Sequence, residues 1–163
     1  MPTSHWKGKI LQHNNNTYIP VEKLGSGAYA SVWSCYSKNK KKLLAIKIFK
    51  PQEKKSAKKE MRIYDKLNQL NIKNINRIYD YCEHDENMWL VFDLTLGSMY
   101  DVIKKGDNSE LSFKNGLPID LVIKSTYYVL ESLIDLHNAS IVHGDIKPEN
   151  ILLCGKTKKN GDI

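Results

Sequence analysis

Residues 141–153 read IVHGDIKPENILL, so two aliphatic runs enclose a polar loop. Asp145, Lys147 and Asn150 are the side chains of this loop that can carry chemistry. A lone carboxylate between apolar runs is costly to bury unless it is paired or has a chemical role. A carboxylate can orient a hydroxyl, an ammonium can offset charge on a phosphoryl group, and an amide oxygen can hold a metal ion. The loop therefore favours phosphoryl transfer to a hydroxyl.

A glycine pair near the start of the chain is the next informative feature. Residues 24–33, LGSGAYASVW, place Gly25 and Gly27 between apolar segments. Glycines permit a tight turn and let backbone N–H groups approach a ligand closely. The pattern predicts a hairpin with the glycines at its bend. Most such pairs are ordinary turns, so the value of this one depends on the residues that follow.

A lysine and a glutamate follow at positions where charge is unexpected. Residues 43–49, LLAIKIF, predict a strand that is apolar on both faces. Alternation puts Lys47 on one side with Ala45 and Phe49, so Lys47 requires an anionic partner or ligand unless it snorkels to the surface. Residues 54–67 predict a helix whose core stripe includes Glu60, while its lysines face water. Lys47 and Glu60 are therefore predicted to pair.

The rest of the chain predicts two more strands and two helices. The strands are expected at 75–81 and 88–94, with a polar turn between them, and a short helix at 99–105. Pro118 opens a long helix over 118–137. That helix is apolar nearly all round, so we expect further chain or a partner to cover it.

Composition limits the class of protein. The 163 residues are 41% hydrophobic and carry a net charge of +7, much of it in short lysine runs. We interpret these runs as solvated turns and one exposed helix face, and because no nucleic-acid module accompanies them we expect no nucleic-acid partner. No apolar run reaches the roughly 18 residues of a membrane span, so none is expected. The three cysteines lack metal-ligand spacing and suit reduced thiols in the cytoplasm or nucleus.

In this order the motifs resemble the eukaryotic-type protein kinases from Tyr18 to the end of the chain. Lys147 within Lys-Pro-Glu-Asn is similar to the serine/threonine branch, and the SR-protein kinases and their relatives are the nearest subgroup. The resemblance implies an α+β, two-lobed fold. Residues 1–17 would be an N-terminal extension, 18–95 a complete β-rich small lobe with the hinge, and 96–163 the start of a truncated helical large lobe.

The resemblance also implies ATP and Mg²⁺ as cofactors and a protein substrate, with arginine/serine-rich targets following from the subgroup. Asp145 would orient or deprotonate the substrate hydroxyl, Lys147 would stabilise the phosphoryl group and Asn150 would bind Mg²⁺. Lys47, fixed by Glu60, would hold the α- and β-phosphates. Phe92 would be the gatekeeper. The residues implied to surround ATP are Leu24, Gly25, Ser26, Gly27, Ala28, Val32, Ala45, Lys47, Glu60, Phe92, Asp93, Thr95 and Leu152.

Three departures from the kinase pattern leave other functions open. Ala30 stands in place of the third glycine, Gly144 replaces an arginine that grips a phosphorylated activation loop, and no Asp-Phe-Gly motif precedes Ile163. Without that second metal-binding aspartate, a nucleotide-binding or scaffolding fragment without catalysis is one alternative. A small-molecule phosphotransferase of the aminoglycoside or choline kinase type is another, although Lys147 and the glycine hairpin disfavour it.

Overall fold

The computed structural model describes residues 6–70, 72–84, 86–106 and 117–154. Two compact units divide the chain. The sheet unit comprises residues 1–71 and 76–94, and the helical unit comprises residues 72–75 and 95–163. Each unit is built from its own contacts and is described separately.

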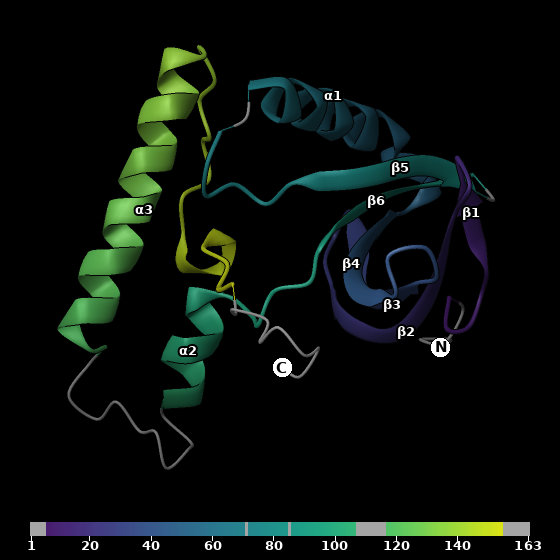
Figure 1. Cartoon of the computed structure of the whole chain (residues 1–163), viewed down its shortest axis with the longest axis horizontal. Coiled ribbons are helices and arrows are strands. Elements are labelled where there is room, and N and C mark those ends of the chain that lie inside the picture. Colours follow the sequence, from purple (N-terminus) through teal and green to yellow (C-terminus); the bar gives the residue numbers. More distant parts are fainter. Residues whose placement is uncertain (1–5, 71, 85, 107–116, 155–163) are drawn as a thin grey trace. The chain divides into compact units, whose positions relative to one another are not determined.

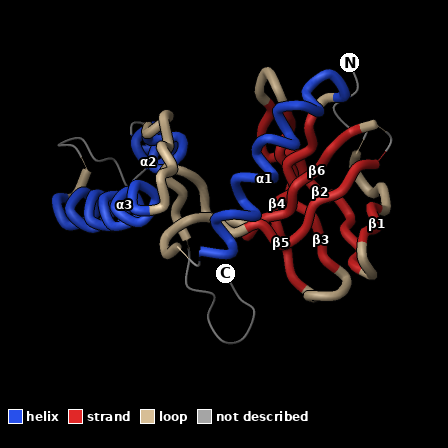
Figure 2. Tube along the Cα trace, turned by 90° about the horizontal axis from the view of Figure 1, so that it is seen from above, coloured by secondary structure: helices blue, strands red, loops and turns tan. Residues whose placement is uncertain are grey.

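One antiparallel sheet forms most of the sheet unit (Figures 1 and 2). Its strands are arranged in the order β1-β2-β3-β4-β6-β5. A 3₁₀ turn, Pro51–Glu53, leads from β4 into α1, which packs against β5 and β6. The elements are β1 (Leu11–His13), β2 (Asn16–Ser26), β3 (Ala30–Ser37), β4 (Lys42–Phe49), α1 (Lys54–Leu70), β5 (Ile78–His84) and β6 (Asn87–Asp93).

Both faces of this sheet are buried, which explains why β4 is apolar on both sides. Ile46 and Ile48 belong to one hydrophobic cluster, together with Trp33 and Trp89. Ala45 and Phe49 contribute to a second cluster, which includes Ala57, Met61 and Tyr64 of α1. Alternate residues of β4 therefore serve two cores, and α1 covers the face that carries the second. The predicted helix and its core stripe are confirmed.

The N-terminal residues differ from the expected extension. Residues 11–13 form β1, which pairs with β2 in the register Leu11↔Tyr18. Asn14 and Asn15 have φ values of 46° and 63°, as both central residues of a two-residue hairpin require. Leu11 is fully buried, and Trp6 is 8% exposed in the same core. The Asn-rich segment is thus a hairpin turn within the sheet, because asparagine tolerates the left-handed conformation.

A buried carboxylate joins this hairpin to β5. Asp80 is 8% exposed and accepts hydrogen bonds from Tyr18 Oη at 2.9 Å and Asn16 Nδ2 at 3.2 Å. His13 Nδ1 lies 2.7 Å from its other oxygen. Burial, with the Asp80 hydrogen bond, raises the pKa of Tyr18 well above its usual range. Because both oxygens of Asp80 have partners, the buried charge is compensated.

β5 begins at Ile78, three residues later than the expected start of this strand at Ile75. The preceding residues 72–75 belong to the helical unit. Asn74 has φ 55°, and its Nδ2 donates to Glu131 Oε2 at 2.6 Å, so it contacts the long helix instead of a strand. This tertiary contact, which periodicity does not reveal, explains the difference.

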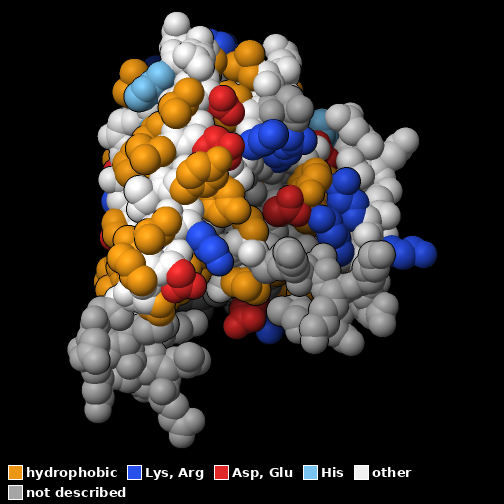
Figure 3. Space-filling view, turned by 60° about the vertical axis from the view of Figure 1, so that its left-hand side comes forward, with side chains coloured by type: hydrophobic (Ala, Val, Ile, Leu, Met, Phe, Trp, Pro, Cys, Tyr) orange, Lys and Arg blue, Asp and Glu red, His pale blue; other side chains and the backbone are white. Residues whose placement is uncertain are grey.

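The helical unit contains α2 (Met99–Gly106), α3 (Ile119–Asn138) and a 3₁₀ turn, η2 (Pro148–Asn150). Ser132 and Leu136 of α3 are buried. On the opposite face Ile123, Leu130 and Ile134 are 61%, 54% and 61% exposed, and hydrophobic side chains gather over α3 in Figure 3. The expected apolar surface is therefore present, and its covering by further chain or a partner stays a prediction. Among the helices in the described ranges, none has the length and apolarity to cross a bilayer.

Candidate active site

The glycine hairpin joins β2 to β3 and is held by the residue after β4. Gly27 N–H donates to Ala30 O at 2.8 Å and closes the bend. Lys50 donates twice to the loop, from Nζ to Ala28 O at 2.5 Å and from its backbone N–H to Tyr29 O at 3.0 Å. The sequence reasoning missed Lys50, because nothing local marks it as a loop anchor.

The hairpin glycines are not required by the backbone. Neither Gly25 nor Gly27 is among the described residues with positive φ. A β-carbon on Gly25 would meet nothing within 4 Å, and one on Gly27 would meet only Ala30 O at 4.0 Å. A tight turn that only glycine can adopt therefore does not explain why Gly25 and Gly27 are glycines. Open space beside the backbone fits close approach by a ligand.

Sheet register puts the implied phosphate-binding and base-binding positions in adjacent rows. Gly25 is opposite Val32, and Val32 is opposite Lys47, so these three residues cross β2, β3 and β4 in one line. Ala45 is opposite Phe92 in the next row on the same face. Phe92 is 7% exposed and Leu24 is 51% exposed. Val32 and Ala45 are partly exposed in these rows. The face thus offers apolar side chains beside a lysine, which suits a base attached to phosphates.

Lys47 and Glu60 form the predicted pair. Lys47 Nζ lies 2.7 Å from each carboxylate oxygen of Glu60, and the two side chains are 30% and 29% exposed. Ala57 of α1 is fully buried in the same cluster as Phe49 of β4, so the side of the helix that carries Glu60 packs on the sheet. Packing of a helix on a sheet therefore fixes the position of this ammonium.

The loop at 141–153 is anchored by backbone bonds to the segment that follows β6. Leu96 N–H donates to Leu153 O at 2.8 Å, and Leu153 N–H donates to Gly97 O at 2.9 Å. Met99 N–H donates to Ile151 O at 2.8 Å. Asp101 Oδ2 accepts from the backbone N–H and the hydroxyl of Ser98, both at 2.7 Å, so this pair caps α2. The segment 96–99, about 55 residues earlier in the sequence, thereby holds the end of the loop in place.

Within the loop the three predicted side chains meet. Lys147 Nζ and Asn150 Nδ2 each lie 2.9 Å from Asp145 Oδ2, and Asn150 Nδ2 also donates to Asp145 O at 2.8 Å. The hydrogen bond from Lys147, followed by that from Asn150, lowers the pKa of the Asp145 carboxyl. The same bond raises the pKa of Lys147. Asp145 is thus a carboxylate and Lys147 an ammonium at neutral pH.

The backbone of the loop depends on Gly144. Its φ is +75°, a conformation that side chains rarely adopt. His143 Nδ1 accepts the Asp145 N–H at 3.3 Å, which fits a structural role for His143. Gly144 therefore has a conformational reason in this chain, in addition to being a departure from the arginine of the kinase pattern.

The loop also offers ligand atoms of the type that Mg²⁺ prefers. Asn150 directs its amide nitrogen to Asp145, and its Oδ1 accepts no hydrogen bond from the described residues. Amide and carboxylate oxygens suit Mg²⁺, which is commonly held by one or two protein groups plus substrate phosphates. Within the described ranges, no group of three acidic, histidine or cysteine residues could hold a metal by itself. The donor set fits a metal that arrives with phosphates.

Comparison with known proteins identifies the family. The pattern of the protein kinase domain matches residues 18–161. The dual specificity protein kinase YAK1 of Saccharomyces cerevisiae is 32% identical over 88% of this chain and 18% of its own length. Homeodomain-interacting protein kinase 1 of Mus musculus is 32% identical over 89% and 12%, and the serine/threonine-protein kinase AFC1 of Arabidopsis thaliana is 32% identical over 83% and 29%.

A solved structure agrees with the sequence comparison. The crystal structure of the PF14_0431 kinase domain superposes with a TM-score of 0.76 and 28% identity, covering 91% of this chain and 42% of that one. This chain therefore spans less than half of the length of these relatives and of that structure. The expected kinase-like α+β fold is confirmed. By these matches, this chain belongs to the protein kinase family.

Proposed function

We propose that this chain supplies the N-terminal part of the catalytic domain of a serine/threonine protein kinase. The Asp145–Lys147–Asn150 cluster carries the proposal, because it joins a proton acceptor, a cation and a metal-ligand oxygen on one anchored loop. The Lys47–Glu60 pair supports it from the sheet unit. Named relatives include a serine/threonine kinase and a dual specificity kinase, and both names fit transfer to hydroxyls.

Each proposed residue has one task in the reaction. Asp145 orients the substrate hydroxyl and accepts its proton as the hydroxyl oxygen bonds to the γ-phosphorus and ADP leaves. Lys147 offsets charge on the phosphoryl oxygens. Lys47 binds the α- and β-phosphates, and Glu60 keeps its ammonium in place. Asn150 would hold Mg²⁺, which when bound neutralises phosphate charge.

The nucleotide base is proposed to contact the sheet face beside the hairpin. Leu24 and Val32 would pack on the adenine, with Ala45 and Phe92 behind it. The assignment of Leu152, which is 41% exposed, to the base stays a prediction. The backbone of Asp93 and Thr95 would bond the adenine edge, and the loop residues Ser26 and Ala28 would cover the phosphates.

The substrate is proposed to be a protein, and arginine/serine-rich segments are a narrower proposed class of substrate. The chain itself is proposed to be intracellular. The free cysteines Cys35, Cys82 and Cys154 fit a reducing compartment. The relatives named above are protein kinases, which favours a protein over a small-molecule acceptor. The SR-protein kinase subgroup stays a prediction.

Two measurements on the purified chain test the proposal together. Thermal stability with and without Mg·ATP reports nucleotide binding, and transfer of labelled γ-phosphate to a basic serine-containing protein reports catalysis. We expect a stabilising shift that Lys47→Met reduces strongly and that Lys58→Met, a change at an exposed lysine of α1, leaves unchanged. Labelling of an aminoglycoside or choline, with unlabelled protein, would contradict the proposal.

A nucleotide-binding fragment without catalysis is the second candidate. It is favoured by the small metal-ligand set: among the described residues Asn150 is the one ligand we assign, and no group of three acidic, histidine or cysteine residues could hold a metal ion. A thermal shift without phosphate transfer, in this chain and in a longer chain that adds an Asp-Phe-Gly segment, would support it. Transfer restored by the longer chain would support the kinase.

A further inference from the structure

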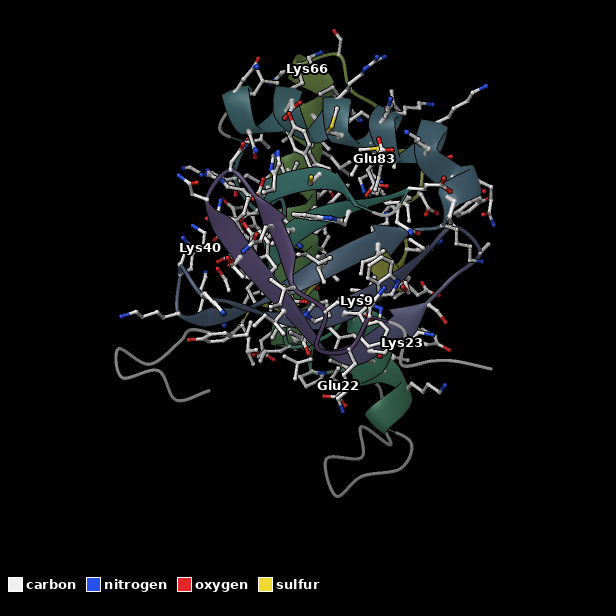
Figure 4. All side chains as sticks on the ribbon, turned by 90° about the vertical axis from the view of Figure 1, so that its right-hand side faces the viewer. Lys9, Glu22, Lys23, Lys40, Lys66 and Glu83 are labelled. Atoms are coloured by element: carbon white, nitrogen blue, oxygen red, sulfur yellow. The ribbon has the colours of Figure 1, made fainter. Side chains whose placement is uncertain are left out.

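Side chains from three neighbouring strands converge where β6 ends (the sheet is seen in Figure 4). Lys42 begins β4, Tyr79 lies in β5, and Asp93 is the last residue of β6, the strand between them. Tyr79 Oη donates to Asp93 Oδ2 at 2.8 Å, and Lys42 Nζ donates to Asp93 Oδ1 at 3.0 Å. Lys42 Nζ also lies 3.4 Å from Tyr79 Oη. The three groups close a triangle around one carboxylate.

A β-bulge places Tyr79 in this triangle. β5 pairs with β6 as Ile78↔Phe92 and then Asp80↔Val91, so Tyr79 is the extra residue. A bulge changes the direction in which a side chain points. Ile78 belongs to the cluster under α1, whereas Asp80 bonds Tyr18 of the other core. The bulge therefore lets Ile78 and Asp80 serve opposite faces and leaves Tyr79 at the outer edge beside Asp93.

The charges around Tyr79 stabilise the same arrangement. Lys40 Nζ, in the turn before β4 and labelled in Figure 4, lies 4.5 Å from the centre of the Tyr79 ring, and Lys42 Nζ lies 5.1 Å from it. Burial and the hydrogen bond to Asp93 raise the pKa of Tyr79. Partial burial lowers the pKa of Lys42, but the hydrogen bonds of Lys42 to Asp93 and Tyr79 outweigh burial, so the pKa is raised overall. The phenol thus stays neutral and the ammonium charged at neutral pH.

The exposure of these groups indicates what they can affect. The Lys42 and Asp93 side chains are 46% and 45% exposed, and exposed ion pairs contribute little to global stability. Their effect is local instead. Two rotatable bonds separate the Asp93 carboxylate from its Cα, and Leu44 opposite Asp93 is the last pairing of β4 with β6. The carboxylate of the last residue of β6 is thus held from two sides, by Tyr79 and by Lys42.

We propose that Tyr79 and Lys42 are positioning residues for recognition of the nucleotide base. By holding the Asp93 carboxylate they fix the backbone of residues 93–95, whose carbonyl and N–H groups would bond the adenine edge. This inference rests on the proposed function. Tyr79 and Lys42 would therefore affect binding of the base but not binding of the phosphates. Lys47 and the glycine hairpin would bind the phosphates elsewhere in the sheet unit.

The first test needs no nucleotide. Hydrogen exchange of the backbone amides of residues 93–95 is measured in the full chain and in Tyr79→Phe, which removes only the hydroxyl. Tyr36→Phe, another partly exposed tyrosine on the sheet, is the control. We expect about three- to tenfold faster exchange at 93–95 in Tyr79→Phe, the worth of about one hydrogen bond, and unchanged exchange in Tyr36→Phe. Unchanged exchange in Tyr79→Phe would overturn the positioning role.

The second test separates the base from the phosphates. Affinities for Mg·ATP and for Mg·tripolyphosphate, which lacks the base, are compared in the wild type, Tyr79→Phe and Lys42→Gln, with Lys38→Gln as the charge-matched control. We expect about three- to tenfold weaker ATP binding in Tyr79→Phe and Lys42→Gln, with tripolyphosphate binding within about twofold of wild type. Equal losses for both ligands, or unchanged ATP binding, would overturn the inference.

The two tests also distinguish this inference from the proposed function. A wild-type chain that binds neither ligand would contradict the proposed function and the assignment to the base, while the exchange measurement would still decide whether Tyr79 orders residues 93–95. A wild-type chain that binds ATP, with a Tyr79→Phe variant that matches it in both tests, would remove only the inference.

Discussion

Two acid–lysine pairs of similar length occupy different surroundings in this molecule. Lys47 and Glu60 lie 2.7 Å apart with about 30% of each side chain exposed, whereas Lys147 and Asp145 lie 2.9 Å apart with 46% and 61% exposed. The first pair joins a strand to a helix that packs on it. The second lies within one loop. The difference shows that similar distances can reflect tertiary packing in one place and sequence proximity in another.

The loop pair should dominate chemistry. In a kinase domain completed beyond residue 163, Asp145→Asn should reduce turnover by ~10²–10⁴, because a positioned base is lost while the loop keeps its backbone anchors. Turnover and Mg·ATP affinity are measured together, and affinity should stay close to wild type. Turnover equal to that of the wild type would remove Asp145 from the reaction.

The packed pair should dominate nucleotide affinity. Lys47→Met should weaken Mg·ATP binding by about ten- to a hundredfold, since hydrogen bonds to charged groups are worth about 1.5–3 kcal/mol. The control is Lys58→Met, because Lys58 lies on the exposed face of α1. Isothermal titration measures both variants, and equal affinities would show that Lys47 does not contact the phosphates.

The glycines of the two regions offer a matched comparison of backbone strain. Gly144→Ala should destabilise the loop by about 1–2 kcal/mol, because an alanine at φ +75° is strained. Gly25→Ala should leave stability nearly unchanged, since its β-carbon would meet open space. Hydrogen exchange at residues 141–153 and 24–32 measures each locally. Equal protection in Gly144→Ala and wild type would contradict the conformational role of Gly144.

Breaking the Lys147–Asp145 ion pair should have the smallest effect on stability of these changes, but a clear effect on the pKa of the Asp145 carboxyl. The pKa of Asp145 is lowered in the folded chain, so its contribution is present above the unfolded value of about 3.8 and is lost as pH falls through the lower, folded value. Lys147→Met should move the carboxyl pKa back toward its ordinary value, as followed by carbon NMR. High salt should do the same in part, because exposed pairs are screened. An unchanged pKa in Lys147→Met would mean that Asn150 alone lowers it.

Local patterns predicted much of the candidate site. The strand at 43–49, the helix beginning at Lys54 and the Lys47–Glu60 pair all followed from periodicities of two and 3.6 residues. The loop residues followed from their spacing. The Asn14-Asn15 turn carries a usable signal for the β1–β2 hairpin, since paired asparagines favour positive φ, although the kinase resemblance assigns residues 1–17 to an extension.

What the sequence by itself determined is local. Asp145, Lys147 and Asn150 lie within six residues, so a single turn of chain brings them together whatever surrounds it. Family membership rests on the order of such local motifs. Burial preference also determined that the strand at 43–49 would be covered on both faces, because seven nearly continuous apolar residues are costly to leave in water.

Only the tertiary structure decided the contacts between distant segments. Lys42 meets Asp93 across 51 positions and Tyr18 meets Asp80 across 62. A one-residue bulge at Tyr79 sets which face each of its neighbours serves, and alternation along the strand does not reveal it. The physical reason is that such contacts depend on the register and packing of whole elements, which are set by all of their neighbours together and not by any one stretch of sequence.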